Sequence, residues 1–376
     1  MGVFPLDRIL SQTVGSDINI FSFENIVQGS DNPKIAIIGA GVSGLAAAWA
    51  LKDSDWEVSV FEKSRGPSGR AATRTINGFR VDHGANYFKL NSPELEELVL
   101  RELPNEDLIQ ISGNVYLFDE SSEVTRGDDQ LNNEDKWNYK NGISELGKRI
   151  AECSTAKFIK QTRVVSFEEI SNSAWEIRCE DGNNLGVFDA VLFTPPAPQL
   201  LELIRDSIIS SGSLESLTEL LEESEYHSQF SVIMGFDERI NRPSDCCAML
   251  NKDRKHAVSW LGFEEAKSGR VDTDQSVIVA QMSPQWTESF YDSCDDIIFN
   301  ESLSEVSKLI KIPNEGPLWK DKQRWRYAHP KVALDIEEVE ECSPDGWFFC
   351  GDSFVGRGRV GEAILTGFDA ANRILK

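Results

Sequence analysis

The sequence of 376 residues predicts an α/β protein, in which a parallel sheet with covering helices is combined with a second, discontinuous α+β domain. Three observations lead to this fold class. Residues 34–62 read as strand, glycine-rich turn, helix and strand, residues 162–193 contain a series of short strands, and residues 346–375 read as a strand followed by a helix. Strands that alternate with helices indicate a parallel sheet, because parallel neighbours need a long crossover connection.

The first of these segments begins K-I-A-I-I-G-A-G-V-S-G at residues 34–44. Its apolar start is typical of a buried parallel strand, and its glycines have the spacing G-x-G-x-x-G. In this motif Gly39 permits the tight turn, Gly41 lets a pyrophosphate approach the backbone, and Gly44 lets the helix pack closely on the strand. The start of the next helix offers free N–H groups to the phosphates. The segment therefore predicts a Rossmann-type dinucleotide site.

The strand at 57–62 ends in Glu62, about 20 residues after Gly41, where a carboxylate accepts hydrogen bonds from ribose hydroxyls. A glutamate there suits a free 2′-hydroxyl better than a 2′-phosphate. The loop that follows, residues 63–70, carries Arg65 and Arg70, which can face a pyrophosphate. The fingerprint alone does not distinguish FAD from NAD.

Composition excludes several classes of protein. The net charge of −24, from 38 basic and 62 acidic residues, argues against binding to nucleic acid or to anionic membranes. Seven cysteines without a C-x-x-C spacing indicate a reducing compartment, so we expect a soluble cytoplasmic protein. No apolar stretch is long enough for a transmembrane segment. The four histidines show no metal-binding spacing, and residues 1–33, which lack the pattern of a signal peptide, are expected to form a flexible arm.

Several later segments give the chain a resemblance to a known family. The loop Gly-Pro-Ser-Gly-Arg at 66–70 and then Asp-His-Gly-Ala-Asn-Tyr-Phe at 82–88 resemble the flavin amine-oxidase superfamily. Ser-Trp-Leu at 259–261, ahead of Gly269-Arg270, and Trp-Arg-Tyr-Ala-His-Pro at 325–330 resemble its renalase-like branch. The resemblance covers about residues 34–375. It implies an FAD-binding Rossmann-type (glutathione-reductase-like) domain with a discontinuous α+β substrate domain.

A second cofactor motif lies near the end of the sequence. A strand ends in Gly351-Asp352, and a helix begins near Val360 and Gly361. The resemblance implies that Asp352 bonds the ribityl or pyrophosphate part of FAD, and that the helix start points at the flavin pyrimidine edge. A helix N-terminus stabilises the negative charge of a reduced flavin there. Two cofactor motifs, one near each end of the chain, favour FAD over NAD.

The fingerprint and the resemblance together give a set of expected site residues. The predicted cofactor-binding residues are Gly39, Gly41, Val42, Ser43, Gly44, Glu62, Lys63, Arg70, Ala85, Asn86, Tyr87, Val164, Gly351, Asp352, Val360 and Gly361. Val164 is expected to contact the adenine through its backbone. The candidate catalytic residues are three aromatics that can stack on a substrate: Tyr87, Trp260 and Trp325.

The domain organisation follows from the same motifs. We predict that the FAD-binding domain comprises residues 34–91, 141–196 and 340–376. The substrate domain is predicted to comprise the two intervening segments, residues 92–140 and 197–339.

The resemblance implies an FAD-dependent oxidoreductase. Renalase-like proteins take hydride from aberrant dihydro isomers of NAD(P), with molecular oxygen as the acceptor that yields hydrogen peroxide. A dihydropyridine needs no general base, which agrees with the lack of an obvious His/carboxylate dyad. Two enzyme alternatives are a flavin amine oxidase, which often has a lysine near the flavin that the sequence does not reveal here, and a carotenoid-type oxidoreductase. The alternative from another class is an FAD-containing binding or signalling protein without turnover.

Overall fold

The computed structural model describes residues 32–171, 174–209 and 214–376, and the chain from Pro33 to Lys376 forms one compact unit. The predicted N-terminal arm lies almost entirely outside these described residues. None of the described helices combines the length and the apolar character that crossing a membrane requires. All seven cysteines are free thiols.

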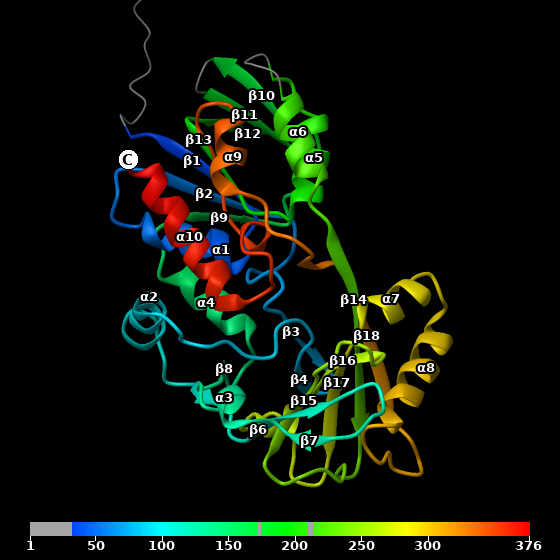
Figure 1. The fold of residues 1–376 in the computed structure, drawn as a ribbon. Helices are drawn as coiled ribbons and strands as arrows, with labels where there is room; N and C mark the ends of the chain where they lie inside the picture. The colour runs from blue at the N-terminus through cyan, green and yellow to red at the C-terminus, as the bar shows by residue number, and fades with distance from the viewer. Residues whose placement is uncertain (1–31, 172–173, 210–213) are drawn as a thin grey trace, which may run out of the picture. The chain divides into compact units, whose positions relative to one another are not determined.

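A five-stranded parallel sheet forms the centre of the first layer (Figure 1). Its order is β19-β13-β1-β2-β9, and every neighbouring pair runs parallel. The strands are β1 (Lys34–Ile38), β2 (Glu57–Glu62), β9 (Lys157–Lys160), β13 (Ala190–Phe193) and β19 (Trp347–Phe349). The predicted Rossmann-type α/β fold is therefore confirmed.

Both faces of this sheet are buried, which explains the continuous apolar sequence of β1. Ile35 and Ile37 pack into a core with three helices on one face, whereas Ala36 and Ile38 pack into a second core on the other. The helices of the first core are α1 (Val42–Ala50), α4 (Ser144–Glu152) and α10 (Val360–Ile374). Successive side chains of a strand point to opposite faces, so a strand buried on both sides has no polar alternation.

The second core is covered by a small sheet and three helices (Figure 1). These elements are β10 (Val164–Ser171), β11 (Ala174–Cys179), β12 (Asn184–Phe188), α5 (Ala197–Arg205), α6 (Glu215–Glu222) and α9 (Ile336–Glu341). Helices α5 and α6 lie within residues 197–339, the segment predicted for the substrate domain. Their Leu200 and Leu217 are buried in the core that contains Trp347 of β19. The apolar side of each helix is thus used by the first sheet.

A seven-stranded sheet forms the second layer, in the order β18-β14-β17-β16-β15-β6-β7. Its strands are β6 (Asn114–Phe118), β7 (Thr125–Arg126), β14 (Tyr226–Phe236), β15 (Cys246–Asn251), β16 (Val258–Phe263), β17 (Ser276–Met282) and β18 (Trp319–Pro330). Neighbours are antiparallel except for β6 and β15, which are parallel. Two helices, α7 (Pro284–Ser289) and α8 (Asp295–Ser307), cover one face over a core that includes Phe230 and Ile298.

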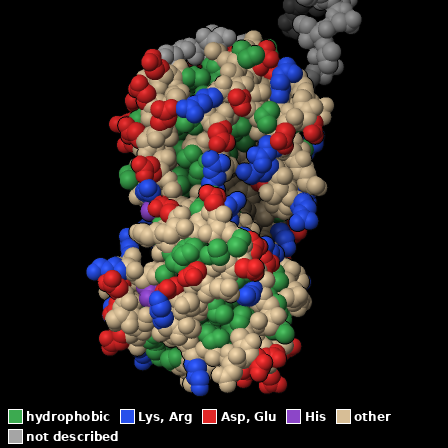
Figure 2. All heavy atoms as spheres, turned by 90° about the vertical axis from the view of Figure 1, so that its right-hand side faces the viewer, with side chains coloured by type: hydrophobic (Ala, Val, Ile, Leu, Met, Phe, Trp, Pro, Cys, Tyr) green, Lys and Arg blue, Asp and Glu red, His purple; other side chains and the backbone are tan. Residues whose placement is uncertain are grey.

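The remaining elements connect the two sheets. They are β3 (Thr73–Ile76), β4 (Phe79–Asp82), α2 (Pro93–Glu97), the π-helix η1 (Leu98–Glu102), β5 (Leu108–Gln110), α3 (Asp129–Asn132), β8 (Trp137–Tyr139), and the 3-10 helices η2 (Glu264–Ala266) and η3 (Asp352–Phe354). Leu95 of α2 and Leu98 of η1 join the core around α1, although residues 92–140 were assigned to the substrate domain. On the face shown in Figure 2, acidic and basic side chains are intermingled.

Candidate functional site

The glycine-rich turn joins β1 to α1, as its spacing predicts. Gly39 has a φ of 106°, which favours glycine, and Gly41 is the N-cap of α1. A Cβ at Gly44 would lie 2.5 Å from the carbonyl oxygen of Gly39, so close packing excludes a side chain there. A Cβ at Gly41 would meet nothing within 4 Å. The space in front of Gly41 is therefore open to a ligand, next to the free N–H groups at the start of α1.

Glu62 stands at the end of β2, beside this turn. Its two carboxylate oxygens accept hydrogen bonds from the backbone N–H of Ala40 at 2.8 Å and of Ser64 at 2.7 Å. The side chain is buried. Each oxygen keeps a lone pair for a further donor, so the predicted ribose contact is compatible with this geometry.

The loop after β2 returns to the glycine-rich turn. Ser68 donates its backbone N–H to the carbonyl of Ala40 at 2.7 Å, and it has a φ of 94°. Two residues later, Arg70 forms an ion pair with Asp352 through two hydrogen bonds of 2.7 Å. The pair joins the N-terminal fingerprint to the C-terminal motif. Lys63, in contrast, points to Gln199 at 3.0 Å.

The C-terminal motif lies beside the start of α1. Gly351 has a φ of 121°, and a Cβ there would lie 3.7 Å from the hydroxyl of Ser43. Asp352 is buried and also accepts a hydrogen bond from the hydroxyl of Tyr226 at 3.0 Å. The second cofactor motif thus meets the first in space. Val360 and Gly361 begin α10, and the buried Val164 begins β10.

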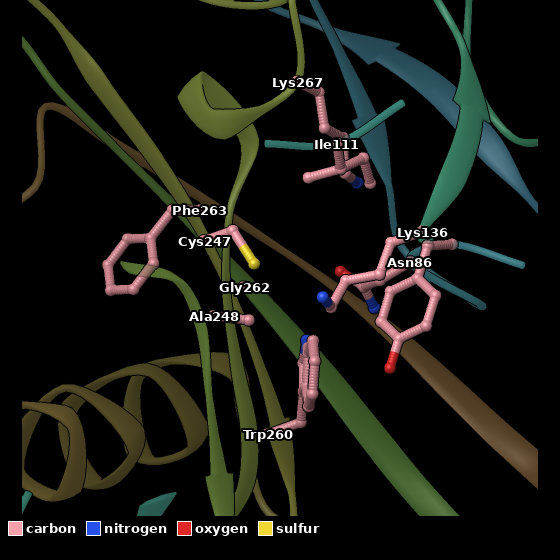
Figure 3. A pocket seen from close by; sticks show the side chains of 10 residues that line it. Asn86, Ile111, Lys136, Cys247, Ala248, Trp260, Gly262, Phe263 and Lys267 are labelled. Carbon is pink, nitrogen blue, oxygen red and sulfur yellow. The ribbon is translucent and has the colours of Figure 1, made fainter. Parts of the chain in front are cut away.

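The segment 84–87 leads from this cofactor region to a small pocket. Ala85 donates its backbone N–H to the carbonyl of Arg70 at 3.0 Å, and Asn86 and Tyr87 then line the pocket. The remaining lining residues come from the second sheet, from the segments beside β5 and β8, and from the end of η2: Ile111, Lys136, Cys247, Ala248, Trp260, Gly262, Phe263 and Lys267. Figure 3 shows the side chains of Lys136 and Trp260 pointing into the space between them.

The two lysines of the pocket differ in their partners. Lys267 pairs with Asp82 at 2.8 Å and with Glu264 at 2.6 Å, and Arg270 also bonds both carboxylates, at 3.1 and 3.2 Å. All four side chains are buried. Burial alone would raise the pKa of Asp82, but Lys267 and Arg270 lower it well below its usual range. Burial raises the pKa of Glu264.

Lys136 is also buried, with 4% of its surface exposed. In the described part of the chain, no carboxylate pairs with its ammonium group. Burial raises the pKa of the neighbouring Cys247 thiol, and the charge of Lys136 opposes this shift. Lys136 therefore brings to the pocket an ammonium group that forms no ion pair with the described residues.

The aromatic residues predicted for catalysis do not all meet at this pocket. The rings of Tyr87 and Trp260 are 5.8 Å apart and both line it. Trp325 lies outside the lining, where its indole stacks on His83 at 5.4 Å and donates to the carbonyl of His83 at 3.0 Å. The indole N–H of Trp325 thus already has a hydrogen-bond partner within the protein.

Comparison with known families identifies this architecture. The model of the family described as flavin-containing amine oxidoreductase matches residues 105–375, and that of the NAD(P)-binding Rossmann-like domain matches residues 37–103. The chain belongs to the flavin-containing amine oxidoreductase family. This membership confirms FAD as the expected cofactor and an FAD-dependent oxidoreductase as the expected class of enzyme.

Similar individual proteins agree with the family. Protoporphyrinogen oxidase 2 of Arabidopsis thaliana is 39% identical over 80 residues, which are 20% of this chain and 16% of that protein. The zeta-carotene-forming phytoene desaturase of Myxococcus xanthus is 41% identical over 68 residues, 18% of this chain and 13% of that protein. The chain thus spans less than a fifth of the length of these two relatives.

A solved structure from Exiguobacterium sp. 255-15, provisionally named a protoporphyrinogen oxidase, has the same fold. It has a TM-score of 0.74 at 15% identity, with 92% of this chain and 99% of that chain covered. At 15% identity, this similarity shows only that the two chains share a fold.

The residues of this flavin amine oxidoreductase fit an FAD molecule. The open face of Gly41, the start of α1 and the carboxylate of Glu62 offer a place for the pyrophosphate and the ribose. In the segment 82–88, which the resemblance places near the flavin, Nδ1 of His83 is a buried polar atom without a hydrogen-bond partner among the described residues. Such an atom indicates that a bound group completes the site.

Several pocket residues were missed by sequence reasoning. Lys267 belongs to the Lys-Ser-Gly-Arg segment that the resemblance singled out, but its ion pairs were not foreseen. Lys136 and Cys247 carry no motif at all. They become neighbours through the pairing of distant strands, for which the sequence contains no local signal.

Proposed function

We propose that this flavin-dependent oxidoreductase takes hydride from dihydro isomers of NAD(P) that carry the hydride at the wrong ring position, with molecular oxygen as the final acceptor. FAD, when bound, supplies the hydride acceptor and, through its reaction with oxygen, the release of hydrogen peroxide. The work of the protein is to bind the substrate ring beside the cofactor and to keep other substrates out.

The observation that carries this proposal is the position of Lys136, which lines the pocket and has no carboxylate partner among the described residues. A protonated amine in the pocket would face this ammonium group, and two like charges 4 Å apart repel by about 4 kcal/mol at an effective dielectric constant of about 20. No carboxylate lines the pocket within the described residues to offset this repulsion. A neutral dihydropyridine meets no such barrier.

The protonation states of the lining residues agree with chemistry that needs no base. Burial raises the pKa of Tyr87 and also that of Cys247, so both side chains keep their protons near neutral pH. A dihydropyridine loses hydride with the help of its own ring nitrogen, and no proton has to be removed. The tilted pair of Tyr87 and Trp260 offers aromatic surfaces against which a flat ring can pack.

Two findings favour a second candidate, an amine oxidase. The family description names amines, and two lysines line the pocket, as a lysine near the flavin is expected in an amine oxidase. An amine can enter as its neutral form, which Lys136 would not repel. The two candidates therefore differ in the compound that reduces the flavin.

Anaerobic stopped-flow measurement of flavin bleaching distinguishes them. The holoenzyme is mixed in parallel with β-NADH, with the 2- and 6-dihydro isomers of NAD, and with benzylamine at high pH. Fast bleaching by the isomers, and slow or no bleaching by β-NADH and benzylamine, is the expected result. Bleaching by benzylamine alone would assign the protein to the amine oxidases. If no compound bleaches the flavin, the proposal is wrong and a role without turnover gains weight.

A further inference from the structure

Three polar groups of the pocket have no partner within the described residues. Two of them are buried atoms, Oδ1 of Asn86 and the indole N–H of Trp260. The third is the ammonium of Lys136, which lines the same pocket and forms no ion pair with the described residues. Asn86 and Lys136 are more than nine-tenths buried. Each of the two buried atoms costs about 1–3 kcal/mol while it is unpaired, so a ligand that bonds both of them and also accepts from Lys136 would gain affinity.

The geometry of Asn86 fixes which of its atoms faces the pocket. Its Nδ2 donates to the carbonyl of Gly84 at 3.2 Å, and that carbonyl also accepts from Gln281 at 2.7 Å. Oδ1 therefore is the free atom. A Cβ at Gly262 would lie 2.7 Å from this Oδ1 and 3.1 Å from Nε1 of Trp260, so both atoms flank the same small space.

The free groups are thus one acceptor, Asn86, and two donors, Trp260 and Lys136. Figure 3 shows all three side chains around the same space. A carboxylate would satisfy the two donors, but it has no hydrogen for the acceptor. An ammonium would satisfy the acceptor, but it would face Lys136. A primary carboxamide satisfies all three, because its oxygen accepts two hydrogen bonds and its NH2 group donates.

We propose that this pocket recognises a primary carboxamide of the substrate, whose oxygen is held by Lys136 and Trp260 and whose NH2 group is held by Asn86. The inference rests on the proposed function, since the nicotinamide ring carries such a group, and it names the part of the substrate that the protein reads. It also makes Lys136 a determinant of specificity that binds a neutral ligand and excludes a cationic one.

A matched pair of ligands tests the inference on the oxidised holoenzyme. Nicotinamide and nicotinate differ only in the carboxamide and the carboxylate, and their binding is measured by calorimetry and by the change in flavin absorbance. We expect nicotinamide to bind at least about tenfold more tightly, because nicotinate leaves the Asn86 acceptor unpaired. Equal or tighter binding of nicotinate, or no binding of either, would overturn the inference.

Variants of Trp260 and Lys136 then test whether these side chains bind the carboxamide. Trp260→Phe keeps an aromatic ring and removes the donor, and Lys136→Met keeps the chain length and removes the charge. Each is expected to weaken nicotinamide binding about tenfold through the loss of one hydrogen bond. The control variants are Trp56→Phe, which precedes β2, and Lys308→Met, which follows α8; both lie outside the pocket lining. Unchanged binding in both pocket variants would count against the assignment.

The outcome for this inference is separable from that for the proposed function. If the dihydro isomers fail to bleach the flavin while nicotinamide still binds in preference to nicotinate, the reaction is wrong and the carboxamide site stands. If the isomers bleach the flavin but nicotinate binds as well as nicotinamide, the reaction stands and the carboxamide assignment falls.

Discussion

Arg70 and Asp352 are 282 residues apart in the sequence, and they form an ion pair with two hydrogen bonds of 2.7 Å. Arg70 also donates to the carbonyl groups of Tyr327 and Ala328 on β18, at 3.2 and 3.1 Å. One guanidinium group therefore connects the loop after β2, the C-terminal motif and the longest strand of the second sheet. We therefore expect the arrangement of the two cofactor motifs to depend on this connection.

Replacement of Asp352 by asparagine is expected to weaken FAD binding. The substitution removes the charge of a buried acceptor and leaves Arg70 with a poorer partner, a loss of about 1–3 kcal/mol or about 5- to 150-fold in affinity. Titration of the apoprotein with FAD measures this loss. The matched control is Asp321→Asn, because Asp321 also pairs with an arginine, Arg74, but is about one-third exposed. Equal FAD affinity of the two variants would contradict the prediction.

Two alanine substitutions in the glycine-rich turn should have opposite effects. Gly41→Ala meets no neighbouring atom in the free protein, so we expect normal stability but a loss of FAD binding. Gly44→Ala places a methyl group 2.5 Å from the carbonyl oxygen of Gly39 and should lower the free energy of unfolding by about 1–3 kcal/mol. Thermal melts of the apoproteins and FAD titrations separate the effects. A destabilised Gly41→Ala variant that still binds FAD would show that the assignments are reversed.

The buried ion cluster of Asp82, Glu264, Lys267 and Arg270 makes a prediction about stability. Asp82→Asn leaves two buried cations with a single carboxylate, so we expect a loss of about 3–5 kcal/mol in the free energy of unfolding. Urea denaturation measures the loss. The control is Glu222→Gln, which breaks an exposed ion pair with Arg205 and should cost less than about 1 kcal/mol. Similar losses in both variants would mean that the cluster is not held by its charges.

Stability is expected to fall as the pH is lowered from about 6.5 to about 4. Burial, reinforced by Arg74, lowers the pKa of His83 to about 4, and burial, reinforced by His227, lowers the pKa of His329 to about 4. In this range the unfolded chain binds protons at these positions and the folded chain does not, so acid favours unfolding.

Each group can contribute up to about 1.4 kcal/mol per pH unit within that range. Urea denaturation at pH 7 and pH 4.5 measures the effect for the natural protein and for the double variant His83→Gln and His329→Gln. The variant should show a smaller drop between the two pH values. The same drop in both proteins would assign the acid sensitivity to carboxylates instead.

The parts of the site that sequence could predict are those that local geometry determines. Gly39 has a positive φ, and Gly44 packs closely against the carbonyl group of Gly39. Both constraints arise within the same short turn. The apolar run of β1 reflects burial on both faces of a parallel sheet, which is also a local property. The fingerprint, the parallel sheet and the meeting of two cofactor motifs were therefore predictable.

The pocket could not be predicted in the same way, because distant segments build it. Cys247 bonds the carbonyl of Asn114, 133 residues earlier, through the parallel pairing of β15 with β6. The sequence around Lys136 contains no motif from which its place in the pocket, near Cys247, could be predicted. Trp325, in contrast, lies in a sequence motif from which a catalytic role was predicted. Its indole N–H instead donates to a carbonyl group of the protein itself.

The order of the strands in the first sheet has a consequence for the synthesis of the protein. β1 and its glycine-rich turn are synthesised before the second sheet. β19 and α10, which carry the second cofactor motif, are synthesised only after that whole sheet. During most of its translation a nascent chain therefore carries β1 and the fingerprint without β19, and the edge of β13 that will pair with β19 is still open. We therefore expect flavin to be loaded late, and chains released before β19 to carry the fingerprint but to bind FAD weakly.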